Sequence, residues 1–472
     1  MRFKGFVGPA YIKASLNVEC QKCVNLYPEM NEIGTGKEGE IAALMSTPGI
    51  LTWITLPTSP VRAVYTASNG MMYAVGGNKC YRITDTPAAV LLGTLASSTG
   101  YVSFSDNGIA VVLTDGPTGY SIDIVTDVFT SSTFPSFPGA TTLGYLDAYI
   151  LGNIPNSGRF FWTNLNSVTI DPLDFATAEG LPDNMIALYV NNQEAWLFGA
   201  KTTEVFYDCG DANQPFVRRN GAVMEYGLSA PFGVAKLNNT LYWPAQNENG
   251  QGIVVAASGY QPSRVSNHGI ETAMHGKDLS TARAWAYQEA GHGFYVLNFA
   301  DETWAYDVST SQWHQRSSLG SGVEHRIRAD CHCFAYGKHL VGDYITGVIY
   351  EQSLAFLSDS VGSSPKTRSS PHISNEMNRI FYHKFQLDME IGVGLAVGLG
   401  SDPQVALSWS DDGGHTWSAE RWRSGGLIGD YKRRVIWNQL GSARDRVFKI
   451  RITDPVKVVI LGADLEFTVG TS

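Results

Sequence analysis

The sequence predicts an all-β protein, with a β-propeller of six or seven blades followed by a C-terminal, jelly-roll-like β-sandwich. Three observations lead to this fold class. A turn followed by a short apolar strand recurs at spacings of 38 to 53 residues. The chain contains 49 glycines and 11% aromatic residues, a composition that favours many strands and turns. No segment of the sequence has the sustained 3.6-residue apolar period of a major helix.

The repeat defines the predicted propeller over residues 61–355. Each unit contains at least three apolar strands joined by turns rich in Asn and Gly, which favour hairpins. A period of about 40 to 50 residues is typical of propeller blades. Two packed β-sandwiches with similar strand spacing are the alternative. The recurring turns are Asn69-Gly70, Asn107-Gly108, Asp147, Asn191-Asn192, Asn238-Asn239, Gly291-His292-Gly293 and Gly337.

Three further segments complete the predicted organisation. Residues 1–60 form an N-terminal arm that either closes the propeller or contacts a neighbouring subunit. The Ser/Pro-rich stretch 356–372 is interpreted as a linker or exposed loop. Strands resume in residues 373–472, where "FKIRIT" (448–453) alternates apolar and basic residues as a half-buried strand does. These last residues are expected to form the separate C-terminal sandwich.

One short motif marks a hairpin of that sandwich. The segment "SWSDDGGHTWS" (408–418) contains the S-x-D-x-G-x-T-W pattern called the Asp box, at Ser410, Asp412, Gly414, Thr416 and Trp417. Asp and Ser side chains can hydrogen-bond nearby backbone N–H groups in a tight turn, and Gly permits a backbone angle that other residues resist. We therefore predict that the box pins a hairpin and that the Trp417 ring packs over it.

The charge is unevenly distributed along the chain. The net charge is −10, yet residues 371–472 contain 12 basic and 12 acidic residues. Residues 1–370 therefore hold the whole excess, with 22 basic against 32 acidic residues. Because tight binding to nucleic acid relies on basic groups that release counterions, we expect this part to repel DNA. A repulsive wall is still compatible with a duplex that slides past it.

A basic cluster in the C-terminal domain is the one candidate for contact with DNA. Because the same domain contains an equal number of acidic residues, we favour a solvated strand face for this cluster. Its members are Lys432, Arg433, Arg434, Arg444 and Arg446.

The cysteines indicate a protein of a reducing compartment. Six cysteines in 472 residues are too few for a disulfide scaffold. Cys20 and Cys23 have half of a zinc-site spacing, and Cys331 and Cys333 could supply a second pair. The second pair lies in a predicted strand, where alternation places both sulfurs on one face, so we favour core cysteines and no metal. The N-terminus lacks the apolar region of a secretory signal, and no apolar run reaches the roughly 18 residues of a membrane-spanning helix.

No set of residues forms a recognisable active site. "GTGKE" (34–38) and the apolar loop "GVGLAVGLG" (392–400) depart from the phosphate-binding and dinucleotide-binding patterns. "CYRIT" (80–84) comes within one residue of the F/Y-R-I-P motif of sialidases, which makes a glycan-binding or sialidase-like propeller the alternative function. A sialidase carries several Asp boxes within its blades, whereas the single box here lies outside the repeats. We predict a non-enzymatic protein without catalytic, cofactor-binding or metal-binding residues.

Two terminal signatures resemble a known family. The opening "QKCVNLYPE" (21–29), the following "STPGI" (46–50) and the ending from "SWSDDGGHTWS" to "KVVILGADLEF" are similar to the packaged-DNA stabilisation proteins of short-tailed phages. These proteins are also called tail hubs or tail accessory factors. The resemblance extends over essentially the whole chain.

The resemblance implies a structural role in the virion. Such proteins are made in the host cytoplasm and are added late, after DNA packaging, as a ring of about six copies below the portal and its adaptor ring. They retain the packaged genome and provide attachment for the tail needle and the tailspikes. In a ring of six, the acidic excess would total roughly −60 and could line a bore through which double-stranded DNA slides without sequence-specific binding.

Overall fold

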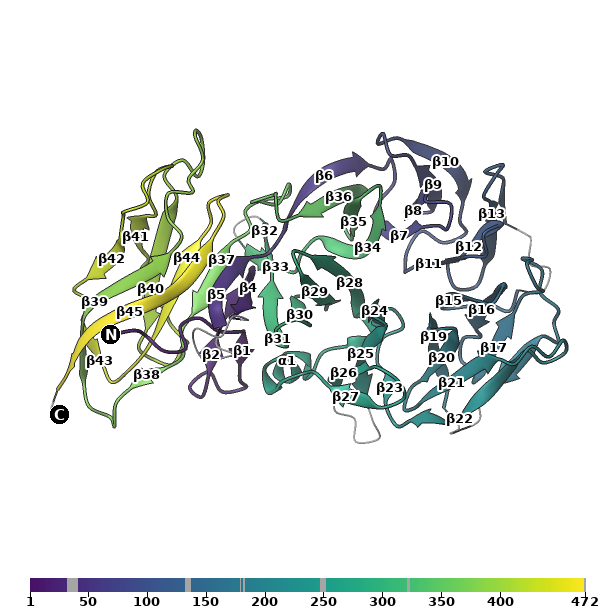
Figure 1. The fold of residues 1–472 in the computed structure, drawn as a ribbon, viewed down its shortest axis with the longest axis horizontal. Helices are drawn as coiled ribbons and strands as arrows, with labels where there is room; N and C mark the ends of the chain where they lie inside the picture. Colours follow the sequence, from purple (N-terminus) through teal and green to yellow (C-terminus); the bar gives the residue numbers. More distant parts are fainter. Residues whose placement is uncertain are drawn as a thin grey trace.

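The computed structural model describes all residues except 32–40, 132–136, 179, 181–182, 247–251, 321–322 and 471–472. The described residues are almost entirely β-structure, with one short α-helix, α1 (His268–Met274), and one 3-10 helix, η1 (Leu279–Thr281). Their strands form a propeller and a sandwich that lie next to each other (Figure 1). No helix in the described ranges combines the length and the apolar composition needed to cross a membrane.

The propeller has seven blades, within the predicted range of six or seven. The sheets fan around a common axis (Figure 1), and in the first four blades the strands follow one another in chain order. These four blades contain β7 (Val61–Thr66), β8 (Met72–Gly76), β9 (Lys79–Ile83) and β10 (Ala89–Thr94); β11 (Ser103–Asp106), β12 (Ala110–Thr114), β13 (Gly119–Asp123) and β14 (Phe129–Thr130); β15 (Leu143–Leu146), β16 (Tyr149–Asn153), β17 (Arg159–Trp162) and β18 (Phe175–Thr177); and β19 (Met185–Asn191), β20 (Glu194–Gly199), β21 (Thr203–Asp208) and β22 (Phe216–Met224).

The last three blades and a small hairpin follow. Their strands are β23 (Gly227–Leu228), β24 (Ala235–Leu237), β25 (Thr240–Gln246), β26 (Ile253–Ala257) and β27 (Pro262–Arg264); β28 (Arg283–Glu289), β29 (His292–Asn298), β30 (Thr303–Asp307) and β31 (Gln312–Arg316); β32 (Ser318–Gly320) and β33 (Val323–His325) of the hairpin; and β34 (Ala329–Ala335), β35 (Lys338–Asp343) and β36 (Val348–Ser353). The N-terminal arm completes the seventh blade, because β6 (Gly49–Thr55) pairs with β36. Strands from both ends of the repeat therefore share one sheet, which closes the ring of blades.

The hairpin turns of the blades have the left-handed backbone conformation that Asn and Gly favour. In the sixth blade the turn lies at Ala290 and Gly291 and not over the whole predicted segment Gly291-His292-Gly293, because His292 and Gly293 pair with the opposite strand and begin β29. Asn238 and Asn239 have φ values of 50° and 61°, as both central residues of a type I′ turn require. In the fourth blade the turn lies one residue later than predicted, at Asn192 and Gln193. The reason is that Asn191 still pairs with the opposite strand and ends β19.

The sandwich uses strands from the arm and from the expected linker as well as from residues 373–472. One sheet has the order β4-β5-β45-β39-β42, and the other contains β37-β44-β40-β41. Phe385, Trp437 and Phe448 are fully buried in its core. The strands are β4 (Leu26–Met30), β5 (Ile41–Ser46), β37 (Lys366–Ser369), β38 (Ile373–Ser374), β39 (Ile380–Met389), β40 (Gln404–Ser410), β41 (Arg421–Ser424), β42 (Val435–Asn438), β43 (Ser442–Ala443), β44 (Asp445–Ile452) and β45 (Val459–Val469).

The interpretation of residues 356–372 as a linker or exposed loop is wrong for their second half. Strand β37 is paired on both edges, with β44 of the sandwich and with β3 (Cys23–Val24) of the arm. Lys366, Arg368 and Ser370 are buried. A polar strand can be buried here because its side chains donate hydrogen bonds to backbone carbonyls of the arm and of neighbouring segments.

Candidate functional site at the domain junction

The propeller and the sandwich are joined by one continuous sheet. Strand β31 of the sixth blade pairs with β3 of the arm, β3 pairs with β37, and β37 pairs with β44. Val24 is opposite Gln315 on one side and opposite Thr367 on the other. The backbone hydrogen bonds of a ten-stranded sheet therefore cross from one domain to the other. Figure 1 shows the purple arm strands in this position between the two bodies.

A buried arginine holds the start of the arm in place. The Arg368 side chain on β37 is fully buried and has no carboxylate partner among the described residues. Burial lowers the pKa of its guanidinium to about 10, so the group remains charged at neutral pH. Its charge is instead stabilised by oxygens of the arm: the backbone carbonyls of Gly5, Phe6, Pro9 and Lys22 and the side-chain Oε1 of Gln21.

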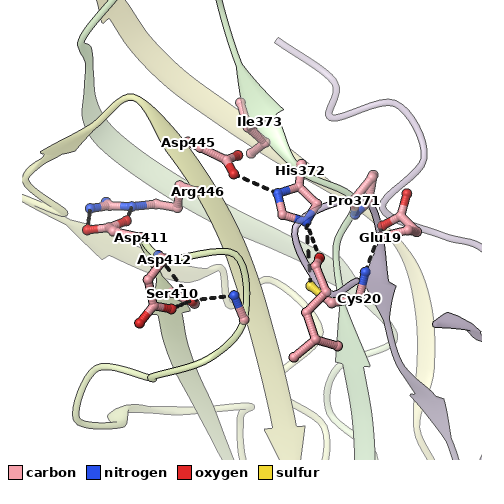
Figure 2. Close-up of polar contacts among 12 residues, drawn as sticks. Glu19, Cys20, Pro371, His372, Ile373, Ser410, Asp411, Asp412, Asp445 and Arg446 are labelled. Atoms are coloured by element: carbon pink, nitrogen blue, oxygen red, sulfur yellow. Dashed lines mark hydrogen bonds and ion pairs between the residues drawn. The ribbon is translucent and has the colours of Figure 1, made fainter. Parts of the chain in front are cut away.

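His372, four residues after Arg368, attaches the arm to the sandwich at a second place. Figure 2 shows His372 between Asp445 of β44 and the arm. Its Nδ1–H donates to the Asp445 carboxylate at 2.7 Å, and its Nε2–H donates to the carbonyl oxygen of Leu16 at 3.0 Å. Hydrogen bonds to Cys20, Asp445 and Leu16 raise the pKa of His372 to about 10. His372 is therefore an imidazolium at neutral pH.

The thiol of Cys20 lies 3.8 Å from His372 Nε2. A thiol, an imidazole and a carboxylate in sequence are the parts of a cysteine nucleophile with its base. In this protein both ring nitrogens of His372 already carry protons directed at oxygen acceptors, and Cys20 is only 5% exposed. The burial of Cys20 and the contacts of His372 with Asp445 and Leu16 describe an attachment of the arm to the sandwich.

A second protonated histidine connects the arm to the sixth blade. His292 of β29 lies between Asp307 and Glu29, with nitrogen–oxygen distances of 2.8 and 3.0 Å. These two carboxylates, Asp307 foremost, raise the pKa of His292 to about 9. Because Glu29 belongs to β4 of the sandwich sheet, this contact also joins the two domains.

The Asp box forms the turn that the sequence predicts. Asp412 accepts hydrogen bonds from the backbone N–H and the hydroxyl of Thr416, and Ser410 Oγ accepts from the Gly414 N–H. Hydrogen bonds from Ser410 and Thr416 hold the pKa of the Asp412 carboxyl well below its usual range. The Trp417 ring is half-buried, and the Lys449 ammonium lies over it at 3.9 Å from the ring centroid.

The position of Arg446 beside Asp411 shows that one member of the basic cluster does not lie on a solvated face. Arg446, expected on a solvated strand face, has a side chain that is only 2% exposed. It donates hydrogen bonds to both carboxylate oxygens of Asp411, at 2.5 and 2.7 Å, and lies over the Tyr382 ring. It is buried because this bidentate pair and the ring compensate its charge. Lys432, Arg433, Arg434 and Arg444 are exposed.

The axis of the propeller encloses a cavity of about 450 Å³. No Asp or Glu is among its described lining residues, and Arg283 is its one charged side chain there. Glycoside cleavage requires placed carboxylates or a Tyr nucleophile with a Glu partner. Arg82 of the "CYRIT" segment pairs with Asp127 and does not line this cavity. The rings around the axis are Tyr65, Phe104, Tyr145, Tyr189, Phe232, Trp285 and His332.

The cysteines do not form a metal-binding cluster with other side chains among the described residues. Within the described ranges, no group of three or more His, Cys, Asp or Glu residues is close enough to hold a metal ion. Cys23 Sγ donates to the Leu26 carbonyl. Cys331 and Cys333 are buried in one apolar cluster between the first and seventh blades. The "GTGKE" segment (34–38) lies outside the described residues.

Sequence reasoning missed the residues that build the junction. Arg368 and His372 lie in a Ser/Pro-rich stretch whose composition is typical of exposed loops. Their partners in the arm are more than 340 residues away in the chain. No local pattern of spacing or periodicity relates such distant positions, so no signal in a single sequence could have identified them.

Both domains match known protein families. One family, described as the β-propeller of bacteriophage P22 Gp10, matches residues 15–355, and a second, described as its β-sandwich, matches residues 367–468. No relative matched the chain among curated proteins.

Solved structures of low sequence identity also resemble the chain. The N-terminal domain of Nup159 is 11% identical, with 70% of this chain and 99% of that chain covered and a TM-score of 0.42. The WD40 propeller domain of Doa1 is 10% identical, with 65% and 97% covered and a TM-score of 0.39. The extracellular domain of BT4673 from B. thetaiotaomicron is 9% identical, with 84% and 57% covered and a TM-score of 0.43.

The family matches agree with the terminal signatures of the sequence and extend over nearly the whole chain. They cover the propeller and the sandwich separately and in the same order as the structure has them. The chain therefore belongs to the bacteriophage P22 Gp10 family, the packaged-DNA stabilisation or tail hub proteins of phage virions.

Proposed function

We propose that this chain is a non-enzymatic part of a phage tail that assembles as a ring of about six copies below the portal and its adaptor. In this proposal the protein is made in the host cytoplasm and joins the particle after DNA packaging. The ring retains the packaged genome and provides attachment for the tail needle and the tailspikes. The observation that carries the proposal is the family match over both domains, in the order found here.

The junction supports a mechanical role. A ring that holds a pressurised genome needs subunits whose domains do not move independently. The continuous sheet and the buried Arg368 provide such a connection. The axial cavity supports the same role, because none of its described lining residues is an acid suited to glycosidic chemistry.

The size of the axial cavity indicates where DNA would pass. The major groove of B-DNA alone is about 12 Å wide, whereas the cavity of the propeller measures about 450 Å³ and is lined by aromatic rings. A duplex cannot pass through a single subunit, so we place the bore between subunits of the ring. The acidic excess of residues 1–370 would then reduce adhesion of the passing duplex.

Native mass spectrometry tests this proposal. The purified chain is weighed alone and after mixing with a portal–adaptor complex. An adduct with about six added copies is the expected result. No adduct, together with turnover of sialylated glycans by the chain alone, would contradict it and would favour the sialidase-like alternative.

A further inference from the structure

A second cavity lies at the place where the arm, the propeller and the sandwich meet. Its volume is about 360 Å³, within the usual range of small-ligand sites. Tyr27 and Met45 come from the arm, Phe356 comes from the segment after the seventh blade, and Val458 comes from the segment before β45. The cavity is therefore a product of the junction and does not belong to any one of the three parts.

One buried cation lines this cavity, beside apolar residues and a smaller number of polar ones. The Lys366 residue on β37 lines the cavity and is only 3% exposed. Its ammonium group donates one hydrogen bond, to the Leu357 carbonyl at 3.1 Å. An ammonium has three N–H donors, and the described residues offer no other acceptor within hydrogen-bond distance. Two N–H donors of this buried cation are thus without a hydrogen-bond partner among the described residues.

The charges around the cavity favour an anion. Burial lowers the pKa of Lys366 to about 8, against the opposing effect of Asp359 and Asp454, so the ammonium form predominates at pH 7. Lys457 also belongs to the lining, but it is exposed and its charge is paired with Glu390. The one acidic residue of the lining, Glu29, contacts the imidazolium of His292 at 3.0 Å. Among the charged residues of the lining, Lys366 is therefore the one without an ion-pair partner among the described residues.

We propose that this cavity binds a small amphipathic carboxylate, whose carboxylate accepts hydrogen bonds from Lys366 Nζ and whose alkyl chain lies against Met45, Phe356 and Val458. A single negative charge matches the single buried ammonium. A phosphate dianion would leave a second charge desolvated in an apolar wall, which is costly. The ligand would contact all three parts of the junction, so its binding stabilises their association by mass action. This inference does not depend on the proposed role in the phage tail.

Titration of the full-length chain with octanoate tests the proposal. Binding is measured by calorimetry, and the site is identified by the ¹³C-methyl signal of Met45, which should be the methionine signal that moves most. Octan-1-ol, which lacks the charge, should bind at least about tenfold more weakly, because a hydrogen bond between charged groups is lost. Each methylene removed from octanoate should weaken binding about fourfold.

Two lysine variants provide matched controls. Lys366→Met should reduce the affinity for octanoate at least about tenfold, while Lys457→Met, at an exposed lysine of the same lining that pairs with Glu390, should change it by less than about threefold. Absence of octanoate binding at millimolar concentration, or equal binding by the Lys366→Met variant, would overturn the proposal. If Lys366→Met does not fold, the comparison between octanoate and octan-1-ol on the wild-type chain decides: equal affinities overturn it.

Discussion

The propeller and the junction hold their strands together in different ways. Within a blade, neighbouring strands are joined by hairpin turns a few residues long, and each sheet buries apolar faces against the next. At the junction, strands from three distant parts of the chain share one sheet, and the buried Arg368 and the half-buried His372 fix their positions. The blades depend on local contacts, and the junction depends on contacts between remote segments.

This difference predicts which substitutions destabilise one hairpin and which destabilise several parts of the molecule. A change within one blade turn affects a single hairpin, and the apolar contacts between neighbouring blades remain. A change at the junction removes contacts on which the arm, the propeller and the sandwich all depend.

The largest effect is expected at Arg368. Arg368→Met removes the donor for five oxygens of the arm and leaves several carbonyls without partners, at a cost of about 3–5 kcal/mol in the free energy of unfolding. Denaturant unfolding followed by circular dichroism measures this cost. Arg444→Met, at an exposed arginine, is the control and should change stability by less than about 1 kcal/mol. A loss below about 1 kcal/mol for Arg368→Met would show that the junction does not rest on this residue.

Two of the four tryptophans in residues 373–472 differ in burial, which allows a comparison within one domain. Trp437 is fully buried in the core, and Trp437→Ala should cost about 3–5 kcal/mol. Trp417 on the Asp-box hairpin is half-buried beneath Lys449, so Trp417→Ala should cost only about 1–2 kcal/mol. Equal losses in denaturant unfolding would mean that the hairpin is part of the core. Unchanged stability combined with failed assembly of the Trp417 variant would identify the ring as a contact with a partner.

The charged histidines make the junction sensitive to alkaline pH. The pKa of His372 is raised from 6.5 to about 10 in the folded chain. A raised pKa contributes stability fully below pH 6.5, and this contribution is lost as the pH rises through about 10. The stability difference between the wild type and His372→Gln should therefore shrink by on the order of 1–2 kcal/mol between pH 6.5 and 10. His415→Gln, at an exposed histidine, is the control; a difference that does not vary with pH would exclude the imidazolium.

The smallest effect is expected in a blade turn. Gly108 has a φ of 80°, and a Cβ added there would meet no atom within 4 Å. Gly108→Ala should therefore cost about 1 kcal/mol through backbone strain alone. Gly158→Ala, at a glycine without a positive φ and with ordinary contacts, should change stability less. A loss of several kcal/mol at Gly108 would contradict the local character assigned to the blades.

The blades could be predicted from the sequence because their signals are local. Asn238-Asn239 and the other turns lie directly beside the strands that they connect, and alternation within a few residues identifies the buried face. The closing strand β6 and the burial of β37 could not be predicted in this way. Lys366 and Arg368 lie in a segment with the composition of a solvated loop. Their burial is possible because the folded arm supplies oxygens to Arg368 and the Leu357 carbonyl accepts from Lys366. The candidate cavity beside Lys366 was unpredictable for the same reason.

We infer that the arm joins the propeller and the sandwich into one cooperative unit. Scanning calorimetry of the full-length chain tests it directly, because domains that unfold independently absorb heat in separate transitions. If the arm couples the two domains, we expect one transition whose calorimetric and van't Hoff enthalpies agree. Two resolved transitions, one for the sandwich and one for the propeller, would contradict it.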